Sequence, residues 1–218
     1  MNSAAFGRWE DFISDELVRY VDGRYRTRPD RAARGIAGQS MGGFGALYLA
    51  GTHSTEFGSV YAMSPCCLGF VGDLAPVPGP GGRWPASTRT GLIKAMATAF
   101  APADRLDGNQ GPMPYVGDST GLWKMDTATV RTWHRFLPLD RLERDPKPYR
   151  VLRAIGLDAG RQDQITNVPR GAEAFAAALK RAGIKHHFEE YDGGHVDRAR
   201  ERFEAALLPF FGQVFTHR

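Results

Sequence analysis

The chain has 218 residues, 42% of them hydrophobic and 24% charged, so it can bury a core and is neither a coiled coil nor a disordered segment. Its formal charge of +4 comes from 28 Lys and Arg that are interleaved with 24 Asp and Glu. No basic stripe with aromatic residues between its charges stands out, so we expect no nucleic-acid partner.

The chain also lacks the marks of a membrane protein. No apolar run approaches the roughly 20 residues of a membrane span, so we expect no membrane partner. Residues 1–11 lack the basic and then apolar profile of a signal peptide. This favours the cytoplasm and leaves a secreted precursor open.

The first predicted element is an amphipathic surface helix from Trp9 to about Tyr25. Its apolar residues recur at helical spacing with charged residues between them. These apolar residues are Trp9, Phe12, Ile13, Leu17, Tyr20 and Val21. A charged, turn-rich link over residues 26–34 leads from this helix to the next element.

Two short apolar runs predict strands on either side of a second helix. Residues 35–38, Gly-Ile-Ala-Gly, predict a buried strand between glycines. Residues 41–51 are small or apolar, which suits a helix packed closely on a sheet, and residues 58–63 predict the next strand. Apolar strands that alternate with helices favour a parallel sheet covered on both faces.

The pattern loosens in the middle of the chain. A Pro- and Gly-rich loop is expected at residues 76–82, and helices are expected near residues 88–100 and 127–136. We interpret about residues 66–148 as an irregular insertion that lies over the strand ends and shapes a substrate pocket. A plain surface loop is the alternative.

Regular alternation resumes towards the end of the chain. It predicts a strand at residues 149–157, a helix at about 168–182, a strand at 186–191 and a final helix at about 198–215. The expected fold class is therefore α/β, with a mostly parallel sheet and helices on both faces, in a single domain of residues 1–218.

The two cysteines, Cys66 and Cys67, are adjacent in the sequence. Neighbouring cysteines rarely reach the separation and Cβ geometry of a disulfide, so we expect both thiols to stay free. With no histidine nearby they also fall short of a zinc site. Packing as small buried side chains is the better interpretation.

The sequence Gly38-Gln39-Ser40-Met41-Gly42 has the pattern G-x-S-x-G where a predicted strand turns into a predicted helix. Glycines leave room for the sharp turn, which exposes the serine hydroxyl over the sheet edge. The helix start offers the backbone N–H of Met41 and a favourable dipole to an oxyanion. Ser40 is therefore the predicted nucleophile, and a Gly-rich turn with a capping serine is the alternative.

A serine hydroxyl is a weak nucleophile until a base takes its proton. His195 is the candidate base because it follows the last predicted strand in a loop with two glycines. Other histidines lack that placement or fit a structural or solvated role at a strand start. They are His53, His134, His186, His187 and His217.

An acid that orients the imidazole is expected between the nucleophile and the base in the chain. Asp163 fits best because it lies in the loop after a predicted strand. Asp158 is the rival, since it lies at the strand end and could equally cap the loop. Asp192 is too close to His195 along the chain.

At these residues the chain resembles the putative-esterase family of α/β-hydrolases, which includes S-formylglutathione hydrolases, feruloyl and acetyl esterases and mycobacterial mycolyltransferases. The resemblance implies an α/β-hydrolase fold with nucleophile Ser40, acid Asp163 and base His195. The insertion matches the family poorly. The residues that carry the resemblance are 7–13, 16–17, 34–47, 157–163 and 194–195.

One departure from the family lies before the nucleophile. Members carry a longer segment with several strands there than the 39 residues that precede Ser40. We therefore expect a sheet shortened at its N-terminal side, with an open edge that a homo-oligomer would cover. The second oxyanion donor would then come from the insertion, the N-terminal residues or a partner chain.

Together these features predict a serine carboxylesterase that acts on small-molecule esters, with short-chain acyl esters favoured, through an acyl-enzyme on Ser40. No metal or cofactor is expected, because the chain has no H-E-x-x-H, Walker or dinucleotide-binding motif. The alternatives are an acyltransferase of the same fold and an inactive homologue that acts as a binding module.

Overall fold

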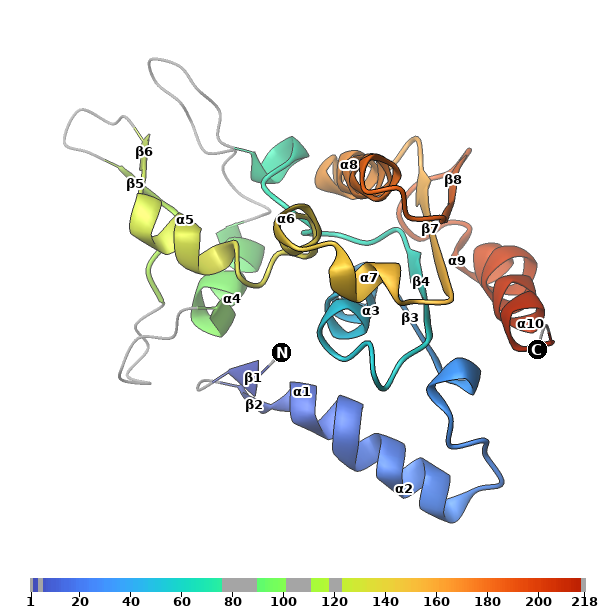
Figure 1. Cartoon of the computed structure of the whole chain (residues 1–218). Coiled ribbons are helices and arrows are strands. Elements are labelled where there is room, and N and C mark those ends of the chain that lie inside the picture. The colour runs from blue at the N-terminus through green and yellow to red at the C-terminus, as the bar shows by residue number, and fades with distance from the viewer. Residues whose placement is uncertain (1, 4–5, 76–89, 101–110, 118–122, 217–218) are drawn as a thin grey trace.

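A computed structural model describes residues 2–3, 6–75, 90–100, 111–117 and 123–216. Its central sheet has the spatial order β3-β4-β7-β8, and every neighbouring pair of these strands is parallel. The expected α/β fold with a parallel sheet is confirmed (Figure 1). The four strands are β3 (Gly35–Gln39), β4 (Ser59–Met63), β7 (Ala154–Gly160) and β8 (His187–Tyr191).

Helices cover both faces of this sheet, as the sequence predicts. One face carries α3 (Met41–Thr52), α6 (Pro138–Arg144) and α8 (Asn167–Arg181). The other carries α9 (Ala199–Arg202), η4 (Phe203–Leu207) and α10 (Leu208–Thr216). None of the helices that the structure describes has both the length and the apolar character needed to cross a lipid bilayer.

Strand β4 divides its side chains between the two faces. Val60 and Ala62 enter the larger apolar core, whereas Tyr61 and Met63 pack with Leu207 on the opposite face. All five residues of β4 are buried. A strand covered on both faces needs apolar side chains at nearly every position, which accounts for the continuous apolar run in the sequence.

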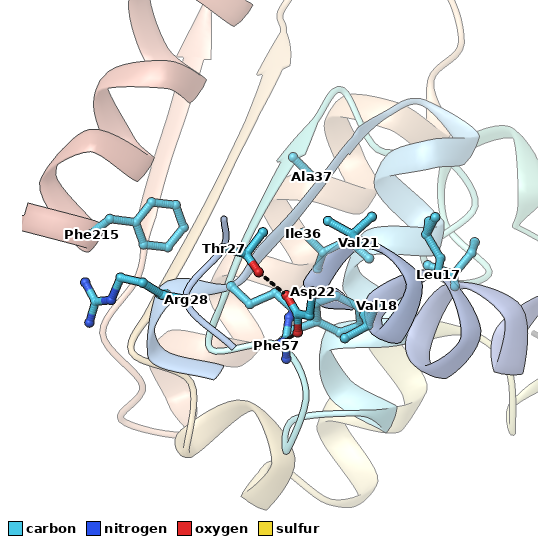
Figure 2. A pocket seen from close by; sticks show the side chains of 14 residues that line it. Leu17, Val18, Val21, Asp22, Thr27, Arg28, Ile36, Ala37, Phe57 and Phe215 are labelled. Carbon is cyan, nitrogen blue, oxygen red and sulfur yellow. Dashed lines mark hydrogen bonds and ion pairs between the residues drawn. The ribbon is translucent and has the colours of Figure 1, made fainter. Parts of the chain in front are cut away.

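Strand β3 lies at the edge of the sheet within the described part of the chain. The expectation that it is buried is wrong, because it has a strand neighbour on one side only and its residues are half-buried or exposed. A groove of about 610 Å³ lies against β3 (Figure 2), and the homo-oligomer expected at such an edge stays a prediction. Residues lining the groove include Ile13, Val18, Val21, Ile36, Phe57 and Phe215.

The predicted N-terminal helix is present and packs across the lower part of the molecule in Figure 1. The Glu10 carboxylate attaches it to α3, accepting from the Tyr48 hydroxyl at 3.1 Å and lying 2.8 Å from Nε2 of His53. Trp9 and Tyr20 are nevertheless 56% and 62% exposed, so part of its apolar surface faces solvent. The helix comprises α1 (Trp9–Asp11), η1 (Phe12–Glu16) and α2 (Leu17–Arg24), after strands β1 (Asn2–Ser3) and β2 (Gly7–Arg8).

The middle segment is only partly as expected. The two predicted helices are present as α4 (Thr90–Phe100) and α5 (Thr127–Trp133), and the loop expected at residues 76–82 lies outside the described residues. Several short elements were not predicted, α6 among them. This segment also contains η3 (Gly72–Leu74) and the antiparallel pair β5 (Tyr115–Gly117) and β6 (Trp123–Met125), and η2 (Arg31–Ala33) lies before it.

The strand expected at residues 149–157 begins only at Ala154. The residues before it form α7 (Lys147–Arg150), and this helix places the side chain of Tyr149 in the core. This side chain is 1% exposed and packs edge-on against Phe175. Its hydroxyl donates to the carbonyl oxygen of Leu47 at 3.1 Å. The apolar run therefore joins a helix to a strand.

Tyr149 gives a stability prediction that separates its ring from its hydroxyl. Tyr149→Phe should lower the free energy of unfolding by about 1 kcal/mol, because one buried hydrogen bond is lost. Tyr149→Ala should lower it by about 3–5 kcal/mol, because a cavity opens under α3. Urea unfolding measures both values, and equal losses for the two variants would contradict the packing role of the ring.

Candidate active site

Ser40 lies on the turn between β3 and α3 in a backbone conformation that is rare for residues other than glycine, with φ 56° and ψ −116°. Hydrogen bonds on both sides hold it there. Its N–H donates to the carbonyl oxygen of Met63 at 2.9 Å, and its carbonyl oxygen accepts from Phe44 at 3.0 Å and Cys66 at 3.2 Å. The surrounding structure thus fixes a strained residue, as is common at functional sites.

Close packing explains why a glycine stands at position 38, two residues before Ser40. A Cβ on Gly38 would lie 2.2 Å from the backbone of Gly42, and one on Gly43 would lie 2.9 Å from the Pro65 side chain. A Cβ on Gly42 would meet nothing within 4 Å among the described residues. The prediction that the turn has no room for side chains is therefore correct for Gly38 and wrong for Gly42.

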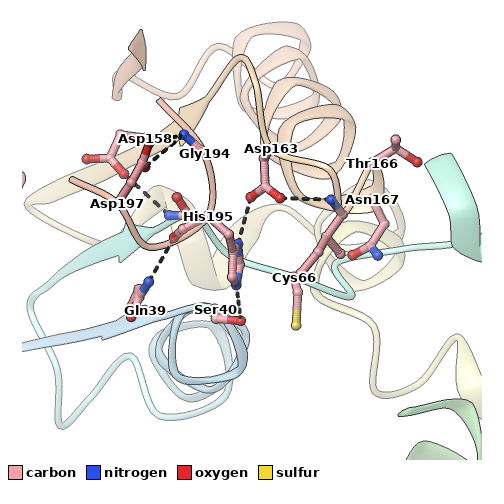
Figure 3. Close-up of polar contacts among 12 residues, drawn as sticks. Gln39, Ser40, Cys66, Asp158, Asp163, Thr166, Asn167, Gly194, His195 and Asp197 are labelled. Carbon is pink, nitrogen blue, oxygen red and sulfur yellow. Dashed lines mark hydrogen bonds and ion pairs between the residues drawn. The ribbon is translucent and has the colours of Figure 1, made fainter. Parts of the chain in front are cut away.

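His195 connects Ser40 to Asp163, so the structure brings the three predicted residues together (Figure 3). Nε2 of His195 lies 2.9 Å from the Ser40 hydroxyl oxygen, and Nδ1 lies 2.6 Å from Oδ2 of Asp163. An ionised carboxylate only accepts hydrogen bonds, so Nδ1 carries the hydrogen in this arrangement. Nε2 is then free to accept the proton of the serine hydroxyl.

The Asp163 carboxylate is fully buried and both of its oxygens have partners. Oδ2 faces His195, and Oδ1 accepts from the backbone N–H of Ile165 at 2.8 Å. The loop between β7 and α8 therefore fixes the carboxylate before any ligand arrives. A buried acceptor held in this way sets both the orientation and the tautomer of the imidazole.

Asp158, the rival acid, belongs to a different buried network. Its oxygens accept from the Tyr61 hydroxyl and Nε of Arg202, both at 3.0 Å, and from the N–H of Ser64 at 3.3 Å. Burial raises the pKa of the Asp158 carboxyl, and Arg202 opposes that shift. Arg202 also binds Glu189 at 2.6 Å, so the network attaches α9 to the sheet.

Asp192 has a third role. Its side chain is 77% exposed and forms an ion pair with Arg161 at 2.9 Å. Asp163 therefore lies against His195, Asp158 belongs to a buried network, and Asp192, which the sequence already disfavours, forms a surface ion pair. The preference for Asp163 agrees with this geometry.

The loop that carries His195 is held by groups that sequence reasoning missed. Nε2 of Gln39 donates to the carbonyl oxygen of His195 at 3.0 Å, which ties the loop to the end of β3. The N–H of Gly194 donates to Asp197 at 2.8 Å, and the N–H of Gln162 donates to Gly193 at 3.0 Å. Gln39 stands inside the G-x-S-x-G motif, but nothing in the pattern indicates its partner.

A close backbone approach sets the distance between the acid loop and the base loop. A Cβ on Gly160, at the end of β7, would lie 2.2 Å from the carbonyl oxygen of Gly193 and 2.8 Å from that of Gly194. Only glycine allows the two loops to come this close. Asp163 and His195 can meet because these loops touch.

The start of α8 behind Asp163 is held by a side chain that the sequence did not reveal. Asp73, from η3, accepts from the backbone N–H of Thr166 at 3.0 Å and of Asn167 at 3.1 Å. The Asn167 side chain in turn accepts from the N–H of Cys67 at 2.9 Å. The loop after β4 is thereby fastened to the acid loop.

The remaining described histidines have partners away from Ser40, as expected. His53 pairs with Glu10, and His134 pairs with Asp140 at 3.0 Å. His186 lies 2.9 Å from the carbonyl oxygen of Ile184, and His187 lies 3.8 Å from Glu189. His217 lies outside the described residues.

Met41 is the first residue of α3 and follows Ser40 directly. The first four N–H groups of a helix have no carbonyl partner within the helix, so this N–H is available to an anion at the turn. The groove against β3 is a separate feature, because its lining residues include none of Ser40, Asp163 and His195.

The chain is similar in sequence to known esterases. Residues 3–213 match the family model described as putative esterase. A curated esterase of Mycobacterium tuberculosis is 29% identical over 196 residues, which cover 87% of this chain and 36% of that protein. The chain thus spans about a third of the length of this relative.

Solved structures of esterases and hydrolases are similar as well. A ferulic acid esterase is 25% identical with a TM-score of 0.61, over 96% of this chain and 62% of that one. An S-formylglutathione hydrolase from Agrobacterium tumefaciens is 17% identical with a TM-score of 0.60, over 94% of this chain and 57% of that one. At this identity the second likeness concerns the fold alone.

The contact at Gly160 gives a prediction for the reactivity of Ser40. Gly160→Ala should slow phosphonylation of Ser40 by a fluorophosphonate about 100-fold, because the new Cβ pushes the His195 loop away. Gly45→Ala is the matched control, since a Cβ there meets nothing within 4 Å. Mass spectrometry of the labelled protein follows both rates, and an unchanged rate for Gly160→Ala would contradict the proposed loop contact.

Proposed function

The chain belongs to the putative-esterase family, and we propose that it hydrolyses carboxylic esters through an acyl-enzyme on Ser40. The observation that carries this proposal is the unbroken chain of contacts from the Ser40 hydroxyl through both nitrogens of His195 to Asp163, at 2.9 Å and 2.6 Å. Nucleophile, base and orienting acid are the three parts that acyl transfer at a serine requires.

In the proposed reaction the Ser40 oxygen attacks the ester carbonyl carbon while Nε2 of His195 takes the hydroxyl proton. The tetrahedral intermediate collapses, the carbon–oxygen bond to the alcohol breaks, and the proton passes from His195 to the departing alcohol. Water then repeats the sequence on the acyl-enzyme, which releases the carboxylic acid. Asp163 stabilises the imidazolium that forms twice in each cycle.

Charge that develops on the carbonyl oxygen needs donors that are already in place. The backbone N–H of Met41 is the donor we propose, because it directly follows the nucleophile at the first turn of α3. The positive end of the helix dipole adds to its effect. The strained backbone of Ser40 is what aims the hydroxyl and this N–H at one point.

Carboxylic esters, with short acyl chains favoured, are the proposed substrates. The similar proteins described above, an esterase and a ferulic acid esterase, support ester hydrolysis. They do not favour an acyltransferase, which would pass the acyl group to an alcohol instead of water. The connected Ser40, His195 and Asp163 argue against an inactive binding module.

The nucleophile is tested with p-nitrophenyl esters from acetate to laurate. The purified chain should hydrolyse them, shorter esters faster, and Ser40→Ala should lower kcat by about 10⁴- to 10⁶-fold because no acyl-enzyme can form. Ser54→Ala, outside the site, is the control. Equal hydrolysis by parent and Ser40→Ala would exclude Ser40, and a folded but inactive parent would favour the binding-module alternative.

Substitution of the two buried carboxylates should affect different properties, activity for Asp163 and stability for Asp158. Asp163→Asn should lower kcat by about 10⁴-fold with little loss of stability, because the amide favours the wrong imidazole tautomer. Asp158→Asn should lower the free energy of unfolding by about 3–5 kcal/mol, because Arg202 loses its buried counter-charge. Kinetics and urea unfolding on both variants separate the two roles, and the reverse pattern would make Asp158 the acid.

A further inference from the structure

Three sulfur atoms meet beside Ser40. The Cys66 thiol lies 2.9 Å from the Cys67 thiol and 3.2 Å from the thioether of Met41, and Cys67 lies 3.9 Å from that thioether. The Cys66 side chain is drawn near Ser40 in Figure 3, and the Cys66 backbone N–H donates to the carbonyl oxygen of Ser40 at 3.2 Å. Both cysteines are free, as the sequence predicts. The proposed ester hydrolysis has no use for these sulfur atoms.

The backbone conformation at Cys67 brings the two thiols together. Successive side chains of an extended segment point to opposite sides, so neighbouring thiols ordinarily diverge. Cys67 instead adopts φ 61°, in the left-handed region, and its N–H is held by Asn167 at 2.9 Å. Such strain persists only where the surroundings enforce it, and it points to a function for the pair.

The three sulfur atoms lie 2.9–3.9 Å from one another, close enough for one ion to contact all of them. A thiolate is the form that binds metal ions.

The cluster is closed on its inner side and open on its outer side. Cys66 and Cys67 are 4% and 0% exposed, whereas Met41 is 49% exposed. The exposed Met41 therefore lies between the buried thiols and solvent. The described residues contain no group of three His, Cys, Asp or Glu side chains suited to a metal, so the third donor here is a thioether.

We propose that Cys66, Cys67 and Met41 bind one soft monovalent cation of the copper(I) type, and that the bound ion blocks Ser40. Two thiolates and a thioether are the donors that monovalent copper prefers, while zinc seeks four ligands. Binding forms three metal–sulfur bonds and releases the thiol protons to solvent, with no change in oxidation state. The bound ion occupies space next to Ser40, which directly precedes Met41 in the chain.

The binding test uses copper(I) supplied without oxygen in competition with a coloured copper(I) chelator. The parent chain should take up one ion per chain. The double variant Cys66→Ser with Cys67→Ser should bind copper(I) more than about 100-fold more weakly than the parent. Loss of a group that only positions a metal ligand costs about 10- to 100-fold, and this variant loses two ligands. Met41→Leu should also bind more weakly, and its exposed position keeps the fold intact. Met63→Leu, in the opposite core, should bind like the parent.

Equal copper(I) affinity in the parent and the double variant, or no uptake by the parent, would overturn the site. Blocking of Ser40 rests on the proposed ester hydrolysis and is read separately. Turnover of p-nitrophenyl acetate should fall in step with copper occupancy and return when excess chelator removes the ion. Full turnover with copper bound would overturn the block while leaving the site, and absent turnover without copper would count against the proposed hydrolysis alone.

Discussion

The backbone turn at Ser40 is the constraint on which the rest of the site depends. The chain passes from β3 to α3 through one residue at positive φ. This turn is possible because Gly38 has no Cβ where the backbone of Gly42 approaches it. That step places the hydroxyl above the sheet and the first N–H groups of α3 beside it. His195 and Asp163 then need only two further loops at the same edge, since parallel strands end together there.

Two buried polar networks lie close together and remain distinct. One joins Ser40, His195 and Asp163, while the other joins Asp158 to Arg202. The first contains the imidazole that takes and returns a proton in the proposed reaction. The second pairs Asp158 with the Arg202 guanidinium and fixes α9 to the sheet. The proposed proton transfer at the sheet edge therefore lies beside an ion pair that holds the fold together.

Local patterns predicted much of this arrangement, and long-range partners account for the rest. The G-x-S-x-G motif and the loop positions of Asp163 and His195 indicated the site because chain order and strand ends are visible in a sequence. The contact of Gln39 with the His195 loop, and of Asp73 with the start of α8, spans 156 and 94 residues, so spacing could not reveal it. Tyr149 was misread because an apolar run looks the same in a buried helix end and in a strand.

The attachment of the His195 loop determines how the site responds to heating. Gln162 and Asp197, which hold Gly193 and Gly194, are exposed, whereas β7 in the sheet beneath them is almost entirely buried. Segments secured by solvent-exposed bonds open at a lower free-energy cost than the core to which they are attached. Warming would thus release the imidazole before the sheet melts. Inactivation would then precede denaturation and be reversed by cooling.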